Sequence, residues 1–144
     1  MKLALLCLLA LSTPAFADPA PACKAEGVAV FAIDHRAMNQ QPTSITTLFA
    51  GGGWTTLAKD GAGKTTTSKK GCLDKAQLAK IEAAVKVPWT VTQKRINCKL
   101  VATTWIVDSV HGKEVFTERA CGRDILDEKS AAALVEIHAI MDKL

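Results

Sequence analysis

Apolar residues recur at helical spacing in only two segments of this 144-residue chain. The other apolar runs are short and rich in Val, Ile, Thr, Phe and Trp, the composition that a half-buried pleated surface favours. Because strands outnumber helices, and the helices can cover one face of a sheet, we predict an α+β fold: a mostly antiparallel sheet with two helices packed on one face. The predicted strands are 28–33, 44–49, 54–57, 65–68, 89–92, 100–108 and 114–119.

The first helical segment begins with a recognisable entry. Asp74 can cap the first, Gln77 can reach back to the capping residue, and Leu73 can pack on Leu78 as a hydrophobic staple. The second is predicted to begin near Asp127 and to close the fold. The expected apolar stripes are Leu78, Ile81 and Val85 in the first helix and Leu134, Ile137, Met141 and Leu144 in the second.

The order of these elements repeats along the chain. Trp54 and Trp105 are each followed by Gly-Lys, then by a cysteine, then by a helix, and in both places the lysine lies eight residues before the cysteine. We interpret the pattern as two similar hairpin-plus-helix halves. The second half then carries residues 122–125 as a four-residue insertion.

Residues 1–17 have the three parts of a secretory signal peptide. Lys2, the apolar run 3–11 and the triplet Ala15, Phe16, Ala17 match the charged region, the apolar region and the cleavage site. The apolar run is shorter than the roughly 18 residues that span a bilayer, so we expect no transmembrane segment. We predict a cleaved signal peptide at 1–17 and one disulfide-stabilised domain at 18–144, secreted or periplasmic. The mild net charge of +4 requires no nucleic acid.

Four cysteines follow the signal peptide: Cys23, Cys72, Cys98 and Cys121. An even count in an exported chain favours two disulfides, and no two of these cysteines have the C-x-x-C spacing of a zinc knuckle. Four cysteines allow three pairings. If the chain returns beside Cys72 after the first helix, Cys72 pairs with Cys98 and Cys23 with Cys121. The rival pairing joins Cys98 to Cys121 across the second hairpin, where a tight turn at 111–112 leaves them about 13 Å apart unless a bulge intervenes.

The octet AKDGAGKT at 58–65 ends like a phosphate-binding P-loop. A P-loop needs a helix after its lysine, so that the helix N-terminus faces the phosphates. Here the threonines at 65–67 favour a strand, and Ala58 stands where the first glycine belongs. We therefore interpret the octet as a hairpin turn built on Asp60, Gly61 and Gly63, and we predict no nucleotide and no cofactor.

Three scattered histidines make a poor metal site. A hydrolytic site could be assembled from Asp34, His35 and a serine such as Ser44. Adjacent strand residues point to opposite faces, however, so Asp34 cannot readily orient His35. We predict no catalytic and no metal-binding residue.

Two surface features could meet a partner. A lysine cluster on one hairpin could touch an anionic polymer, although lysines also discourage pairing at a sheet edge. The polar loop 36–43 (RAMNQQPT) is of the kind that a secreted inhibitor presents to a protease, or it is an ordinary connection. The lysines are Lys59, Lys64, Lys69 and Lys70.

We predict a small exported, non-enzymatic binding domain whose partner is an unknown protein or an anionic surface polymer. The first alternative is a secreted protease inhibitor that uses loop 36–43. The second alternative, from a different class, is a small hydrolase with a site near Asp34 and His35.

Overall fold

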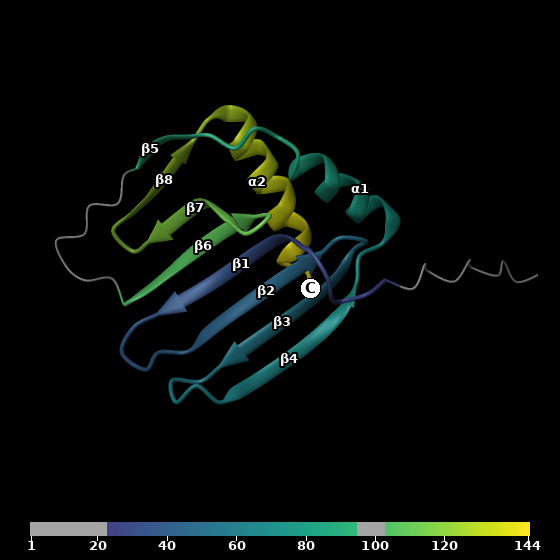
Figure 1. Cartoon of the computed structure of the whole chain (residues 1–144). Coiled ribbons are helices and arrows are strands. Elements are labelled where there is room, and N and C mark those ends of the chain that lie inside the picture. Colours follow the sequence, from purple (N-terminus) through teal and green to yellow (C-terminus); the bar gives the residue numbers. More distant parts are fainter. Residues whose placement is uncertain (1–22, 95–102) are drawn as a thin grey trace, which may run out of the picture.

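The computed structural model describes residues 23–94 and 103–144. Within these ranges the chain forms eight strands and two helices (Figure 1). The predicted signal peptide at 1–17, Cys98 and the first part of the predicted strand 100–108 lie outside the described residues. In chain order the elements are β1 (Ala29–Ala37), β2 (Thr43–Phe49), β3 (Gly53–Lys59), β4 (Thr65–Cys72), α1 (Lys75–Ala84), β5 (Val91–Lys94), β6 (Thr104–Val110), β7 (Lys113–Arg119), β8 (Gly122–Leu126) and α2 (Glu128–Met141).

The strands form one sheet in the order β4-β3-β2-β1-β6-β7-β8-β5. Every neighbouring pair is antiparallel. At the centre, β1 pairs with β6 from Phe31 opposite Val110 to Ala37 opposite Thr104. The α+β prediction with an antiparallel sheet is therefore confirmed, with the sheet as the dominant part.

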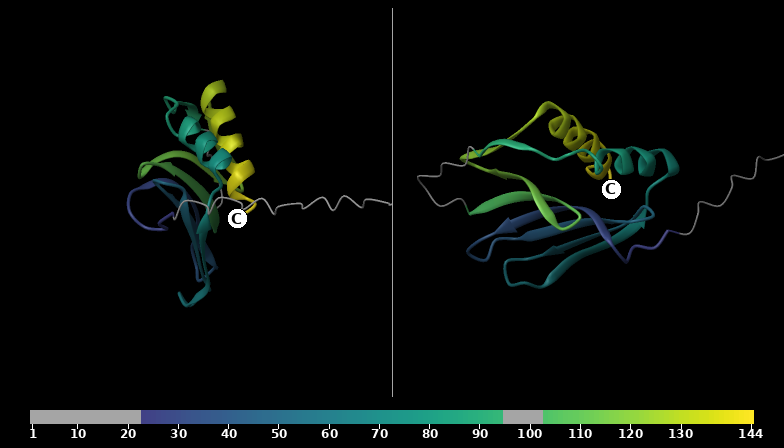
Figure 2. Two further views of the ribbon diagram at one scale, coloured as in Figure 1. Left: turned by 90° about the vertical axis from the view of Figure 1, so that its right-hand side faces the viewer. Right: turned by 45° about the horizontal axis from the view of Figure 1, so that its top comes forward.

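Both helices lie on the same face of the sheet, and no helix of the described ranges covers the other face (Figure 2). α1 follows β4 at one edge, and the chain then reaches β5 at the opposite edge, so this connection crosses the sheet. The core lies between the sheet and the helices, where Leu48, Ile81 and Ile137 are fully buried. Burial of each such side chain stabilises the fold by about 1.5–3 kcal/mol.

The cap predicted for the first helix is confirmed, and the second helix begins with a cap that was not predicted. The Asp74 carboxylate accepts a hydrogen bond from the Gln77 backbone N–H at 2.8 Å, and the Gln77 side chain accepts one from the Asp74 N–H at 3.0 Å. Asp127 accepts one from the Ser130 N–H at 2.8 Å at the start of α2. These bonds satisfy donors that the first helical turn leaves without partners, which fixes where each helix begins.

Residues 122–125, interpreted from the sequence as an insertion, instead belong to a strand, β8. The run Gly-Arg-Asp-Ile-Leu carries little strand propensity of its own. It is held by pairing on two sides, with Arg119 of β7 opposite Gly122 and Val91 of β5 opposite Leu126. The second half of the chain thus has a strand between its cysteine and its helix that the first half lacks. The duplication stays a prediction.

The preferred disulfide pairing is wrong, because the structure joins Cys23 to Cys72, with their Cα atoms 5.9 Å apart. The prediction assumed that the chain returns beside Cys72 after the first helix, whereas it continues to β5 at the far edge. The segment before β1 lies beside Cys72 instead. Gly53 pairs with Cys72, and a Cβ atom on Gly53 would lie 2.0 Å from the carbonyl oxygen of Lys24. Cys121, in the turn between β7 and β8, is also disulfide-bonded.

We expect the double variant Cys23→Ser, Cys72→Ser to lower the free energy of unfolding by about 2–4 kcal/mol, because the disulfide closes a long loop in the unfolded chain. The two cysteines are 49 positions apart. Urea denaturation of the oxidised protein measures the change. The control Thr66→Ser, a conservative change in the same strand, should leave the midpoint unaltered. Equal midpoints for the double variant and the native chain would contradict the expectation.

Candidate functional site

The octet at 58–65 forms the turn between β3 and β4, as the sequence predicts. The Asp60 carboxylate accepts hydrogen bonds from the backbone N–H groups of Ala62 at 3.0 Å and Lys64 at 2.9 Å. Gly63 has a φ of 81°, in the left-handed region that favours glycine. The amides that would bind a phosphate in a P-loop are therefore already occupied by an acidic side chain.

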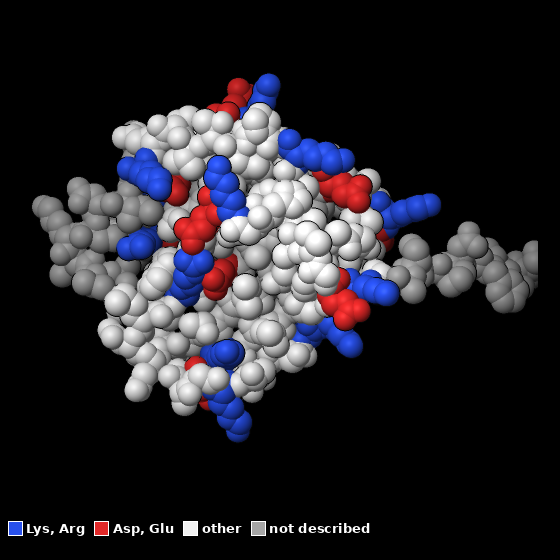
Figure 3. All heavy atoms as spheres, viewed as in Figure 1, with Lys and Arg blue, Asp and Glu red and all other residues white. Residues whose placement is uncertain are grey.

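The four lysines of this hairpin are exposed, but they do not form one cluster. Lys69 pairs with Thr56 and Lys70 with Thr55, so these two side chains point to opposite faces of the sheet. Lys59 and Lys64 flank the turn. On the face in view, positive and negative side chains are interspersed (Figure 3). A role in binding an anionic polymer remains a hypothesis from the sequence.

Asp34 and His35 do not act on one another. The Asp34 carboxylate accepts a hydrogen bond from Arg36 Nε at 2.7 Å, and the Arg36 guanidinium also donates to Glu114 at 2.8 Å. These two hydrogen bonds raise the pKa of Arg36. His35 is exposed, and its imidazole ring makes no hydrogen bond with a side chain of the described residues, although Ser44 lies opposite it on β2. The hydrolase hypothesis therefore gains no support from this geometry.

The loop predicted at 36–43 is shorter in the structure. Arg36 belongs to β1, and only residues 38–42 lie outside the strands. Asn39 and Gln40 have φ angles of 56° and 58°, which is the pattern of a tight hairpin turn. Gly61 lies close against this turn, because a Cβ atom at Gly61 would stand 1.7 Å from the Gln40 carbonyl oxygen. Only the short, tightly turned segment 38–42 is therefore free of strand pairing to serve as the inhibitory loop of that hypothesis.

A groove of about 670 Å³ lies between the sheet and the last helix, and we call it the β8–α2 groove. Its lining is mainly apolar, and Val135 on α2 is exposed over 70% of its surface. The groove was not predicted from the sequence, because one wall is the strand that had been interpreted as an insertion. Its residues are Phe116 of β7, the five residues of β8, and Ala131, Leu134 and Val135 of α2.

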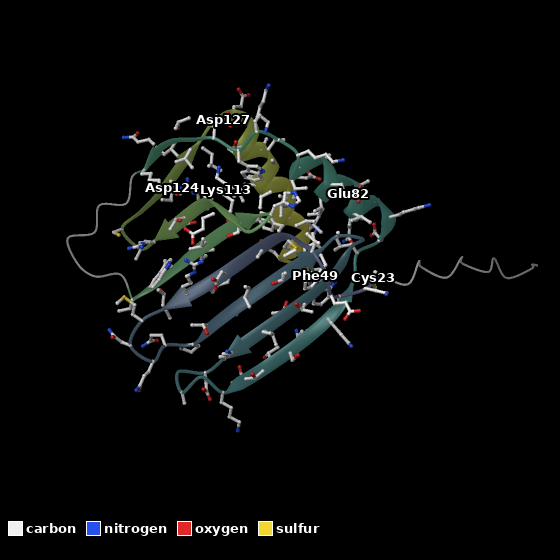
Figure 4. The ribbon with its side chains drawn as sticks, viewed as in Figure 1. Cys23, Phe49, Glu82, Lys113, Asp124 and Asp127 are labelled. Carbon is white, nitrogen blue, oxygen red and sulfur yellow. A yellow bond between two sulfur atoms is a disulfide. The ribbon has the colours of Figure 1, made fainter. Side chains whose placement is uncertain are left out.

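One acidic side chain lies at this groove. Asp124 is only 7% exposed, and Figure 4 labels it on β8. Its Oδ2 atom accepts a hydrogen bond from the Thr117 backbone N–H at 3.0 Å. Its Oδ1 atom is buried and has no hydrogen-bond partner among the described residues. A buried acceptor left without a donor costs about 1–3 kcal/mol, so this oxygen needs a donor that the described residues do not supply.

A second buried carboxylate is paired within the protein. Asp108 of β6 is fully buried, and the His138 Nε2 atom of α2 donates a hydrogen bond to its Oδ2 atom at 3.0 Å. This bond raises the pKa of His138 above its ordinary value of 6.5, although burial lowers it. The negative charges of Asp142 and Glu118 also raise the pKa of His138. The sequence did not predict this contact.

We expect the ion pair between His138 and Asp108 to stabilise the protein at mildly acidic pH and to lose that effect as the pH rises through the folded-state pKa of His138. The sign follows because the folded protein holds the proton more tightly than the unfolded chain does. Thermal unfolding from about pH 5.5 to pH 9 covers the titration of a histidine with a raised pKa. The midpoint difference between the native chain and His138→Gln should shrink towards high pH.

The control for this experiment is His35→Gln, which removes an exposed histidine. Its midpoint difference from the native chain should stay the same across the range. A His138→Gln difference that is constant or grows with pH would contradict the expected effect of the pair.

Comparison with protein-family models, with curated proteins and with solved structures gives no match to this chain. Neither α1 nor α2 has the length and apolar character needed to cross a membrane. Among the described residues, no group of three or more His, Cys, Asp or Glu side chains is arranged to hold a metal ion. The function must therefore be inferred from the site alone.

Proposed function

We propose that this chain is an exported, disulfide-stabilised domain that binds a small ligand with an apolar body in the β8–α2 groove. The observation that carries the proposal is the combination of a mainly apolar groove of about 670 Å³ with one buried carboxylate oxygen that has no donor. Ligand sites in proteins are typically concave and mostly apolar, and a few polar groups fix the orientation of the ligand. The groove has both properties.

Export is supported by two independent features. Residues 1–17 have the pattern of a secretory signal peptide. Cys23 and Cys72 form a disulfide, and disulfides persist mainly in oxidising compartments. We therefore place the protein outside the cytoplasm, in the periplasm or in the secreted fraction.

Binding without catalysis is the reading that the described side chains favour. A hydrolytic site needs a base in contact with both an orienting acid and a nucleophile. His138 contacts the acid Asp108, but no hydroxyl or thiol of the described residues is hydrogen-bonded to a histidine ring. An unknown protein or an anionic polymer remains a further candidate partner. It would bind at the lysines of the β3–β4 hairpin or at the sheet face that no helix of the described ranges covers.

The neutral fluorescent probe N-phenyl-1-naphthylamine tests the groove. We expect saturable binding, seen as a rise in fluorescence when the probe leaves water. Ala131→Phe places a bulky ring in the groove and should weaken binding by about tenfold or more. Titration of each variant with the probe gives the dissociation constants.

The matched control is Ala139→Phe, the same change at an exposed position of α2 that does not line the groove. It should leave the dissociation constant of the probe unchanged. The groove is the wrong site if the two variants bind the probe equally well. The binding proposal itself fails if the native chain binds no apolar probe.

A further inference from the structure

We infer that the β8–α2 groove is selective for organic ammonium compounds, meaning amines with a positive head group and an apolar body. This inference rests on the proposed function, since it names the class of ligand that the same groove would take. Its basis is the chemistry of Asp124, the one acidic side chain among the residues that line the groove.

The two oxygens of Asp124 have different surroundings. Oδ2 is held by the backbone N–H of Thr117 at 3.0 Å, which fixes the carboxylate against β7. Oδ1 is covered by neighbouring atoms and accepts no hydrogen bond from the described residues. Asp124 is one of the residues that line the groove, and the terminal torsion of an aspartate side chain is broad, so its carboxylate can turn towards a ligand bound there. A ligand that donates to Oδ1 therefore completes the hydrogen bonding of this group.

The protein supplies no cation in contact with this carboxylate. Arg123 precedes Asp124 on the strand and also lines the groove, but it is exposed and forms no ion pair with Asp124 among the described residues. Lys94 of β5 lies directly opposite Asp124 in the sheet, but its side chain is exposed. Within the described ranges, no ion pair joins Asp124 to any basic side chain. A cationic head group is thus the ligand feature that supplies both the missing donor and the missing charge.

The surrounding groove favours an apolar body on the same ligand. Phe116, Leu134 and Val135 present hydrocarbon surface beside the carboxylate. Hydrogen bonds to a charged partner are roughly twice as strong as neutral ones, and they gain further in a partly dry site. The same carboxylate repels an anionic head group. The groove therefore selects the charge opposite to the one that the net charge of +4 leads one to expect.

Three eight-carbon compounds that differ only in the head group test this inference: octylamine, octanol and octanoate. Each is titrated at neutral pH against the protein loaded with N-phenyl-1-naphthylamine, and displacement is followed by the loss of fluorescence. We expect octylamine to bind about tenfold or more tightly than octanol. Octanoate should bind most weakly of the three.

Asp124→Asn should abolish the preference for octylamine over octanol. The control Glu82→Gln removes a carboxylate on the exposed surface of α1, which Figure 4 labels, and should retain the preference. Circular dichroism shows whether each variant is folded. The comparison of octylamine with octanol on the native chain needs no variant, so it tests the inference even if Asp124→Asn does not fold.

The outcomes separate the inference from the proposed function. Equal displacement by octylamine and octanol overturns the ammonium selectivity and leaves a groove that binds apolar ligands. A preference for octylamine that survives in Asp124→Asn also overturns it, because another group would then be responsible. The absence of any binding by the probe and by all three compounds removes the proposed function and the inference with it.

Discussion

The pairing of β1 with β6 is the contact on which the rest of the structure depends. It joins Phe31 to Val110 and Ala37 to Thr104, residues that are far apart in the chain. Without it, the strands would form two smaller sheets, each with an additional unpaired edge. Closing so long a loop costs conformational entropy before any contact is gained, so the pairing must be supported by burial. That support comes from the helical layer, since Phe31 and Ile33 of β1 belong to the core that Ile81 and Ile137 complete.

Local elements could be predicted from the sequence because their causes are local. The caps Asp74 and Asp127 act within one helical turn, and the turns at 60–64 and 111–112 are set by residues that tolerate their backbone angles. Strand pairing could not be predicted in the same way, because a strand can pair with a segment far away in the sequence. Nothing in the run at 91–94 shows that it pairs with β8 at the far edge. The disulfide was predicted wrongly because the position of this strand in the sheet was not known.

The candidate site was hidden for the same reason. Asp124 stands in a five-residue run with no clear alternation, and its burial results from the pairing of β8 with strands on both sides. Leu134 was predicted to pack in the core, and it does lie against the core while also forming one wall of the groove. Adjacent apolar residues at 134 and 135 were the one visible indication that the apolar surface of α2 extends beyond a single stripe.

Two aspartates are buried in the described part of the chain, and each has one oxygen without a hydrogen-bond partner there. Asp108 is compensated from within by His138, whereas Asp124 has only a backbone donor. Buried polar groups in proteins are nearly always hydrogen-bonded, so exceptions call for a specific explanation. Both carboxylates belong to strands that α2 packs against. The helix forms an ion pair with Asp108 through His138, whereas at Asp124 it forms one wall of the groove.

The disulfide between Cys23 and Cys72 has a consequence for local opening. β4 is an edge strand, bonded to the sheet on one side only, and Cys72 is its last residue. Edge strands are among the segments that open first in native-state fluctuations. The turn at 60–64 joins one end of β4 to β3, and the cross-link ties the other end to the segment before β1. Reduction of the disulfide therefore frees the end of β4 that is farthest from the turn, and amide protection should fall most beside Cys72.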